Sequence, residues 1–328
     1  MTPARTLHIT NGDSAAVTMN EARIIGDILP WRDVLHDGPL PPDLSLAQMS
    51  RVRARYLTEI GWAGDRDLGR EFFARDAVVE RYVDYEGIVL WFEWDLYDQL
   101  QLLQLLNFFA SKLGMRENPL KVEIVSFAGY LGTLPIEQFQ ELNNQRQPVT
   151  VPMMMLGRSA WRAVTSSDPR DIEKMRKTDT SSLPFLSEAL TRLLEELPWS
   201  SDGLSRSERQ LLEALDNGAT TFSEVFDYAT NREDRIYCGD ASATLYLNRL
   251  AGGSSPLVSI QTNDSETPSI MTATLGITDN GRKVLQGERD WITLGGSDRW
   301  LGGVHLEGPA AKWRWNSSTQ TVTATPAG

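Results

Sequence analysis

The sequence has a single cysteine, Cys238, among 328 residues, and one thiol cannot form an intrachain disulfide. It also has no run of about 18 apolar residues, the length that a helix needs to cross a bilayer. Basic residues are few, since 32 Lys and Arg face 44 Asp and Glu and the formal net charge is −12. Nucleic acids and anionic membranes attract basic surfaces, so this balance disfavours both as partners. The first residues contain no apolar signal core, and we therefore expect a cytoplasmic protein.

Short apolar runs alternate with helical patterns in the first half of the chain. Residues 6–10, 88–92 and 122–127 predict buried strands of a parallel sheet, and residues 23–29 predict a weaker fourth strand. Amphipathic patterns such as that of residues 45–60 separate the strands. This alternation predicts an α/β fold with a Rossmann-like, doubly wound, mostly parallel sheet.

The second half of the chain has a different pattern. Residues 198–203 form a linker-like tract, and Ser205 with Glu208 three residues later forms a capping box that begins a new helix. Three helical patterns and two strands around a polar insert follow, an order typical of a winged helix. We therefore expect an α/β domain with the site at residues 1–150, a helical connector at 151–200 and a smaller winged-helix-like α+β domain at 201–328.

The turn after the first predicted strand reads Asn11-Gly12-Asp13-Ser14 and begins a helix. Gly12 permits a close backbone approach, and the N–H groups of a helix N-terminus attract anions. The turn therefore predicts a phosphate-type or carboxylate ligand, or a nucleophilic serine. A simple helix cap made by Asp13 or Ser14 is the structural alternative.

Gly-Asp-Ser after a first strand resembles the opening of SGNH, or GDSL-type, hydrolases. Those enzymes pair the serine with a late Asp-x-x-His, and here that motif is Asp33-Val-Leu-His36, only about twenty residues after Ser14. The Gly-x-Asn-Asp block of the family is missing. The resemblance implies a serine esterase with Ser14, Asp33 and His36 as catalytic residues, because chain order does not define a triad.

Residues 29–39 concentrate functional groups in a turn-rich stretch. Here Arg32 is a candidate clamp for an anionic group, and His36 with Asp33 is a candidate for proton transfer or metal binding. The alternative is an arginine–carboxylate brace at a proline-rich corner. Arg55 lies four residues after Arg51 and shares a helix face with it. Such a pair is typical of a solvent-exposed face, and the alternative is that Arg55 makes a second contact to the anion.

Three carboxylates follow the strand at residues 88–92. Glu93 and Asp95 lie at its carboxyl end, and Asp98 lies in the first turn of the next helix. Acidic residues there favour the helix dipole, which is the structural alternative. Their mutual repulsion otherwise indicates a raised carboxyl pKa or a bound cation, and hard oxygen ligands favour Mg²⁺ or Mn²⁺.

Near the end of the chain, residues 298–307 and 313–315 predict an aromatic β-pair that packs on the first domain or seals the second. A lone histidine among apolar residues, here His305, is more often structural than functional.

Four blocks together resemble one bacterial family, the domain-of-unknown-function family numbered eighteen thirty-five. They are His-x-x-Asn-Gly-Asp-Ser at 8–14, Pro-Trp-Arg-Asp-Val-Leu-His-Asp-Gly-Pro at 30–39, Leu-Trp-Phe-Glu-x-Asp-x-x-Asp-Gln-Leu at 90–100 and the terminal Arg-Trp-Leu-Gly-Gly-Val-His block. The family name implies no established reaction. Trp94 stands where many relatives are expected to have histidine, which weakens the case for a histidine-containing metal site.

The leading hypothesis is an anionic, nucleotide-like or phosphorylated small molecule bound at the carboxyl ends of the strands, with metal-assisted hydrolysis or group transfer. A serine esterase is the second hypothesis. The third is a non-catalytic regulatory or adaptor protein whose winged helix binds protein, because residues 241–250 contain only one base, Arg249, and DNA readout needs more.

Overall fold

The computed structural model describes residues 5–113, 121–262 and 269–324. Its central sheet has the strand order β2-β1-β4-β5-β6, with parallel neighbours from β2 to β5 and an antiparallel β6 at one edge. The fold is therefore α/β with a mostly parallel sheet, as predicted. The strands are β1 (Thr6–Thr10), β2 (Asp27–Pro30), β4 (Gly87–Glu93), β5 (Val122–Phe127) and β6 (Gln147–Pro148).

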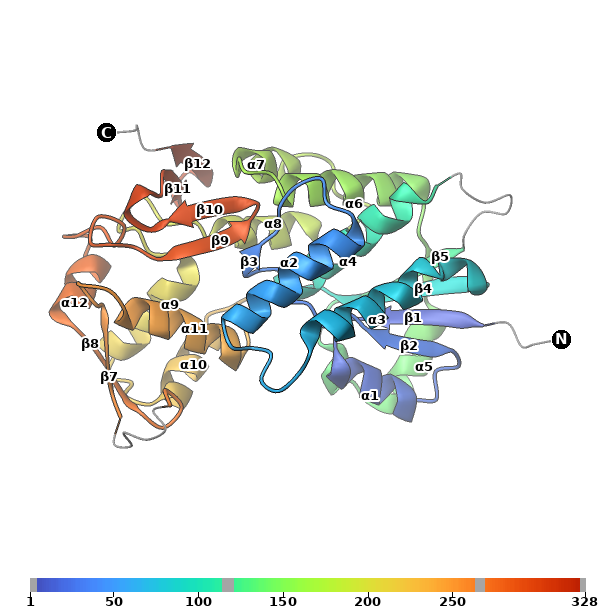
Figure 1. Ribbon diagram of the computed structural model, residues 1–328, viewed down its shortest axis with the longest axis horizontal. Coiled ribbons are helices and arrows are strands. Elements are labelled where there is room, and N and C mark those ends of the chain that lie inside the picture. The colour runs from blue at the N-terminus through green and yellow to red at the C-terminus, as the bar shows by residue number, and fades with distance from the viewer. Residues whose placement is uncertain (1–4, 114–120, 263–268, 325–328) are drawn as a thin grey trace.

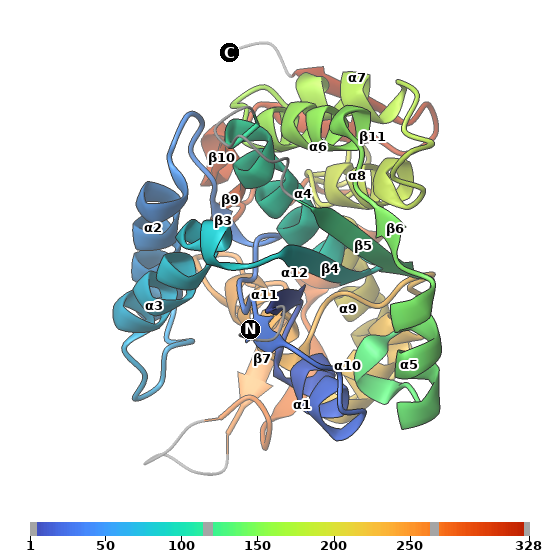
Figure 2. The same ribbon diagram turned by 90° about the vertical axis from the view of Figure 1, so that its right-hand side faces the viewer.

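Helices cover both faces of this sheet, as the end-on view in Figure 2 shows. Side chains alternate along β4, so that Ile88, Leu90 and Phe92 enter the core beneath α4 while Val89 and Trp91 enter the core beneath α1 and α5. This two-sided burial explains the continuous apolar run of β4. The helices of this sheet unit are α1 (Asp13–Glu21), α2 (Leu46–Glu59), α3 (Leu68–Glu80), α4 (Leu96–Ser111), α5 (Ile136–Asn144), α6 (Val151–Val164), α7 (Arg170–Arg176) and α8 (Leu186–Leu194).

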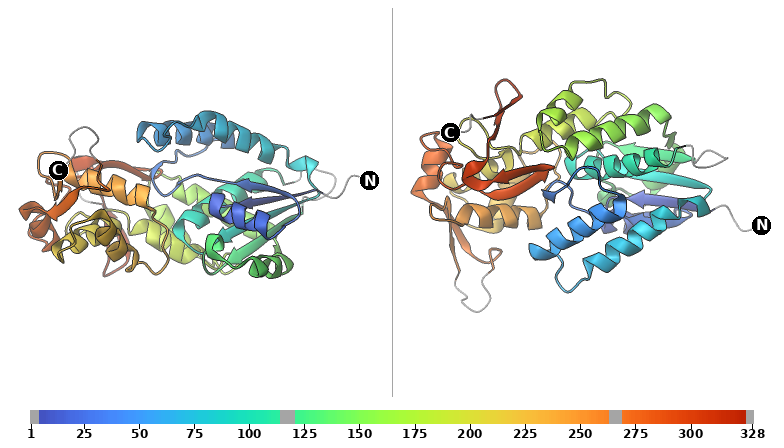
Figure 3. Two further views of the ribbon diagram at one scale, coloured as in Figure 1. Left: turned by 90° about the horizontal axis from the view of Figure 1, so that it is seen from below. Right: turned by 45° about the horizontal axis from the view of Figure 1, so that its top comes forward.

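A second hydrophobic core lies between Leu204 and Trp291. Three helices, a β-hairpin and a final helix surround it, and this winged-helix unit (orange in Figure 1) occupies the end of the molecule opposite the N-terminus, which Figure 3 also shows. Its elements are α9 (Arg206–Asp216), α10 (Phe222–Thr230), α11 (Asp240–Ala251), β7 (Val258–Gln261), β8 (Thr274–Ile277) and α12 (Asp279–Leu285).

The last strands return to the core of the sheet unit. Leu301, Val304, Trp313 and Trp315 belong to that core and not to the core of the winged-helix unit. The short strand β3 (Gly38–Pro39) pairs with β9 (Asp298–Gly302), so residue 38 lies beside residue 301. The remaining strands are β10 (Val304–Glu307), β11 (Trp313–Asn316) and β12 (Thr321–Ala324). The boundaries at residues 150 and 200 stay predictions.

No helix within the described ranges combines the length and the apolar character that crossing a membrane requires.

Candidate functional site

The order in which the chain adds strands to the sheet changes direction between β1 and β4. From β1 the chain continues to β2 on one side and later returns to β4 on the other side. The carboxyl ends of β1 and β4 therefore flank a topological switch point, where open α/β sheets bind their ligands. Asn11 follows β1 at this point, and Glu93 ends β4.

The three predicted carboxylates converge at the switch point. One oxygen from each of Glu93, Asp95 and Asp98 lies within 4.8 Å of the others, and the three residues are 5%, 3% and 1% exposed. Asn11 bridges two of them, because its Nδ2 donates to Glu93 Oε1 at 3.0 Å and to Asp98 Oδ2 at 2.9 Å. The backbone N–H of Leu131 donates to Glu93 Oε1 at 2.7 Å.

Two of these carboxylates also hold the start of α4. Asp95 is its N-cap and accepts from the backbone N–H of Asp98 at 3.2 Å, and Asp98 accepts from the backbone N–H of Glu93 at 2.7 Å. The capping role that the sequence offered as an alternative is therefore present for Asp95. Capping uses one oxygen of Asp95 and does not explain why Glu93 is buried beside it.

Burial changes the acidity of all three groups. Burial and the neighbouring Asp95 raise the pKa of Glu93 to about 7, and burial raises the pKa of Asp95 to about 6. The pKa of Asp98 is raised well above its usual range by burial and by the charges of Asp95 and Glu93. The cluster therefore retains protons near neutral pH unless a cation replaces them.

The N-terminus of α1 adjoins this cluster. Its N-cap is Gly12, which makes no side-chain capping bond within the described residues, and a Cβ on Gly12 would meet nothing within 4 Å. The space beside Gly12 is therefore open, whereas Gly132 packs against Ser14 in the first turn of α1. Asp13 lies on this rim and forms an ion pair with Arg32, which follows β2, with an Nε to Oδ1 distance of 2.9 Å. Arg32 has a φ of 55°, a backbone conformation that non-glycine residues rarely adopt.

Asp33 lies apart from this rim, in the interior of the sheet unit. It is 0% exposed, its Oδ1 is 3.1 Å from Arg53 Nε, and its Oδ2 is 4.0 Å from Arg75 Nη1. Arg53 also donates to the carbonyl of Val34 at 2.7 Å. Asp33 is therefore the brace that the sequence offered as an alternative, although its partners come from α2 and α3.

His36 lies between the two units. Its Nε2 is 3.3 Å from Ser242 Oγ on α11, and its ring meets that of Tyr237 edge-on with centroids 4.9 Å apart. Burial lowers the pKa of His36 to about 4, so the ring is neutral at pH 7. His36 therefore helps to hold the two units together, and the interpretation as a proton-transfer group beside the ligand is not supported.

The predicted triad of Ser14, Asp33 and His36 is not assembled. Ser14 is exposed, and its Oγ is 3.5 Å from the carbonyl oxygen of Gly132, while the other two residues have the partners given above. In the described part of the chain no hydrogen bond joins any two of the three. Residues 33 and 36 are one turn apart in sequence, but their side chains point to different interiors, so spacing alone misled the prediction.

We expect a fluorophosphonate probe to leave Ser14 unlabelled, because no base is within hydrogen-bond reach of its hydroxyl. We also expect Ser14→Ala to change the free energy of unfolding by less than about 0.5 kcal/mol, since the side chain is exposed. Labelling is measured by mass spectrometry, with a known serine esterase labelled in parallel. Labelling of the wild-type protein that Ser14→Ala abolishes would restore the esterase hypothesis.

Two further candidates lie away from the cluster. Arg55 is on the exposed face of α2 and pairs with Glu59 at 2.7 Å, whereas its neighbour Arg53 is buried, so Arg55 is a solvated residue and not a ligand contact. His305 stacks on Trp300 with ring centroids 4.3 Å apart and lies 2.7 Å from Asp298 Oδ1. Arg55 therefore agrees with the prediction of a solvent-exposed face, and His305 agrees with the prediction of a structural histidine.

Sequence reasoning missed the glutamines of α4. Gln99 Nε2 donates to the carbonyl of Glu93 at 2.6 Å, Gln101 Nε2 donates to the carbonyl of Asp33 at 2.8 Å, and Gln104 Oε1 accepts from Trp31 Nε1 at 2.7 Å. A signal was available, because amides inside a dense leucine run are buried and must find partners. These bonds fix the loops after β2 and β4 relative to α4.

Comparison with family models finds no match for this chain, and comparison with curated proteins finds none either. Among solved structures, the chain is similar to the Orc1 protein of Aeropyrum pernix in complex with DNA. The identity is 10%, the alignment covers 87% of this chain and 86% of that chain, and the TM-score is 0.20. A score this low carries no argument about function. The resemblance to family eighteen thirty-five stays a prediction.

The exclusion of nucleic acid as a partner is a prediction that has to be corrected. The Orc1 protein named above is in complex with DNA, although its TM-score of 0.20 lets it carry no argument about this chain. Net charge averages over the whole surface, whereas a nucleic-acid contact needs only a local group of basic side chains. The charge of −12 is therefore no ground for an exclusion.

Proposed function

We propose that Glu93, Asp95 and Asp98 bind one divalent cation, Mg²⁺ or Mn²⁺. The observation that carries this proposal is the convergence of three buried carboxylates within 4.8 Å at the switch point of the sheet. Three anions this close are unstable together in a low-dielectric interior, and a cation relieves both their repulsion and their desolvation. Carboxylate oxygens are the ligands that these hard cations prefer. Asn11 acts as a positioning residue, because its amide holds two of the carboxylates.

We further propose that the ligand is an anionic, phosphorylated or nucleotide-like small molecule. The N-terminus of α1 begins at Gly12, the residue after Asn11, and the space beside Gly12 is open, so an anion bound there would lie next to the carboxylates. Arg32 lies on the same rim and is 41% exposed, which leaves its guanidinium accessible to a second anion oxygen.

The reaction class that this arrangement supports is hydrolysis or group transfer at phosphorus. A bound cation would supply Lewis-acid polarisation of a phosphoryl oxygen. The N–H groups of α1 and Arg32 orient the anion. The same motifs carry the resemblance to family eighteen thirty-five, and we propose that the chain belongs there.

Isothermal titration of the wild-type protein with Mn²⁺ and with Mg²⁺ tests the cation site. We expect one site per chain, and we expect Glu93→Gln to weaken the affinity for Mn²⁺ by at least about tenfold, because it replaces a charged ligand by a neutral one. Glu137→Gln is the matched control, since Glu137 is an exposed acidic residue in the first turn of α5.

The ligand is tested with a panel of nucleotides and sugar phosphates, titrated with and without Mg²⁺. We expect at least one of them to bind more tightly with Mg²⁺ and to lose that gain in Glu93→Gln. Absence of Mn²⁺ binding to the wild-type protein would overturn the cation site, and absence of binding by every phosphate in the panel would overturn the ligand class.

A further inference from the structure

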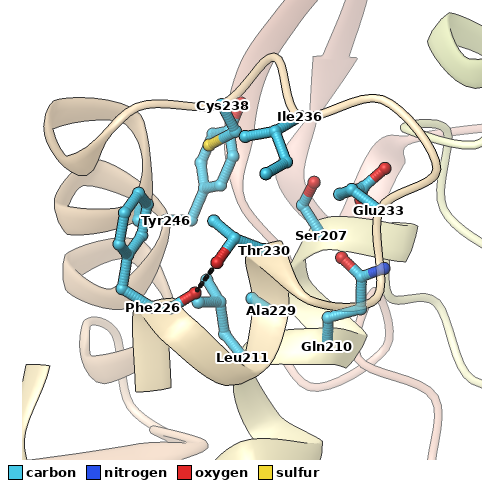
Figure 4. Close-up of a pocket in the computed structure, with 11 residues that line it drawn as sticks. Ser207, Gln210, Leu211, Phe226, Ala229, Thr230, Glu233, Ile236, Cys238 and Tyr246 are labelled. Atoms are coloured by element: carbon cyan, nitrogen blue, oxygen red, sulfur yellow. Dashed lines mark hydrogen bonds between the residues drawn. The ribbon is translucent and has the colours of Figure 1, made fainter. Parts of the chain in front are cut away.

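Two cavities away from the carboxylate cluster differ in what they can hold. The cavity beside Ile236 and Cys238, which Figure 4 shows among α9, α10 and α11, has a volume of about 20 Å³. One water molecule fills that space. A second cavity is lined by residues of α2, α3, α4 and α6 and has a volume of about 180 Å³. We name it the α4 cavity. Since an apolar cavity of about 150 Å³ holds one benzene molecule, the α4 cavity has room for a small organic molecule.

Gln104 gives the α4 cavity a hydrogen-bond donor that the protein leaves unused. This residue lines the cavity and is 3% exposed. Its Oε1 accepts from Trp31 Nε1 at 2.7 Å, which fixes the orientation of the amide because an indole nitrogen can only donate. The other amide atom, Nε2, has no hydrogen-bond partner among the described residues. A buried N–H without a partner is unfavourable, so an acceptor atom bound in the cavity would stabilise it.

Lys112 brings a positive charge to the same cavity. Its Nζ is 2.8 Å from Glu80 Oε2 and lies over the ring of Phe108, 4.7 Å from the ring centroid. All three residues line the cavity. The side chain of Glu80 is 50% exposed, and an ion pair this well solvated is weak. An ammonium group has three N–H donors, so Lys112 can contact a second anion or exchange Glu80 for it.

The rest of the lining favours an anion with an apolar part. Ser45, the N-cap of α2, lines the cavity, and the first turn of α2 has no acidic side chain. A helix N-terminus carries a partial positive charge, which adds to that of the lysine. Leu46, Met49 and Trp161 provide apolar surface in the same cavity. An amphipathic anion therefore matches both the donors and the apolar side chains.

We propose that the α4 cavity binds a small organic carboxylate, whose oxygens accept from Gln104 Nε2 and Lys112 Nζ and whose apolar part packs against Trp161. Inorganic phosphate fits less well, because it has no apolar part to cover this surface. The inference goes beyond the proposed function and does not depend on it. At 1.5 Å per residue, Lys112 lies about 21 Å along α4 from Asp98, so the two sites are separate.

Isothermal titration of the full-length, metal-free protein with benzoate tests the site. We expect one site per chain, and we expect benzyl alcohol, which has the same ring without the charge, to bind at least about tenfold more weakly. Lys112→Gln should weaken benzoate binding by at least about tenfold, because it removes the charged donor. Lys174→Gln is the matched control, since Lys174 is an exposed lysine of α7 that pairs with Asp171 at 3.0 Å.

Two further variants test individual groups of the cavity. Glu80→Gln releases Lys112 from its ion pair, and we expect it to tighten benzoate binding about threefold. Gln104→Glu keeps an acceptor for Trp31 Nε1 but replaces the donor Nε2 by an oxygen, and we expect it to abolish benzoate binding. Circular dichroism checks that each variant is folded, and Lys112→Gln decides the test if Gln104→Glu does not fold.

Binding of benzoate that Lys112→Gln weakens and Lys174→Gln leaves unchanged supports the site. Equal affinity for benzoate and benzyl alcohol overturns the assignment of a carboxylate ligand, and so does inorganic phosphate that binds as tightly as benzoate. Benzoate affinity that is unchanged in Lys112→Gln overturns the assignment of the cavity. Absence of binding by both benzoate and hexanoate up to about 5 mM overturns the proposal as a whole. Glu93→Gln is expected to leave benzoate affinity unchanged, which keeps this test independent of the cation site.

Discussion

Replacement of Asp33 by alanine is expected to lower the free energy of unfolding by about 3–5 kcal/mol. Asp33 and Arg53 are both 0% exposed, so the substitution leaves the Arg53 guanidinium charged and buried without its carboxylate partner. Arg75, which is 5% exposed, loses its 4.0 Å contact with the same carboxylate. Two buried cations near each other without an intervening anion repel, which adds to the cost. Chemical denaturation followed by circular dichroism measures the change.

The matched control is Asp13→Ala, which removes the other Arg–Asp pair near the site. Asp13 and Arg32 are 65% and 41% exposed, and exposed pairs contribute about 0–1 kcal/mol. We expect this variant to stay within about 1 kcal/mol of the wild-type protein and to bind the anionic ligand with altered affinity. Equal destabilisation by the two substitutions would contradict the assignment of Asp33 as a structural brace.

Affinity for Mn²⁺ is expected to fall at least about 20-fold between pH 8 and pH 6, because protons on Glu93 and Asp95 alone compete to this extent and protons on Asp98 add to the competition. The pKa values of about 7 for Glu93 and about 6 for Asp95 place this competition in that range. Of Glu93 and Asp95, Glu93 contributes the larger part because its pKa is higher. Calorimetric titration at several pH values measures it, and Glu93→Gln should flatten the dependence. An affinity that is constant from pH 6 to pH 8 would show that these carboxyl groups are already ionised without the cation.

The metal-free protein should show the corresponding change in stability. Both folded-state pKa values lie above the unfolded values of about 4, so the folded state binds more protons there. Stabilisation from proton binding is therefore complete below about pH 4 and is lost as the pH rises through 6 to 7. We expect the melting temperature to fall from pH 6.5 to pH 8 in a chelator. Burial lowers the pKa of His8 and of His36 in the folded state, so both residues take up protons on unfolding near pH 6.5 and oppose this trend; comparison with Glu93→Gln under the same conditions isolates the contribution of the carboxyl group.

The fold was largely predictable because hydrophobic periodicity reports burial. Residues 122–127 form β5 as predicted, and the run at residues 88–92 forms β4 with one further residue at each end. Helix α3 was not predicted, and its buried face explains why. Arg75 and Asp76 are buried there beside Leu68 and Phe72, so the charged residues conceal the apolar stripe. Amphipathic patterns fail where a helix buries an ion pair.

Some residues of the candidate site were also predictable from local sequence, and others were not. Glu93, Asp95 and Asp98 follow one strand within six residues, and local geometry alone brings them near the start of α4. Asn11 is 82 residues from Glu93 in sequence, and its bond to that carboxylate depends on β1 and β4 being neighbours in the sheet. Strand order is a property of the assembled sheet, and sequence periodicity does not encode it.

The sequence by itself determined most of the helices and strands, the division into two cores and the three acidic residues at the end of one buried strand, since each follows from local pattern and chain geometry. Tertiary structure decided which residues meet. It turned Asp33 toward Arg53 and placed His36 against the winged-helix unit, although both residues belong to one short loop. The physical reason is that a loop side chain takes the direction in which its charge or ring is best compensated, and its partners come from α2 and α11, elements distant in the chain.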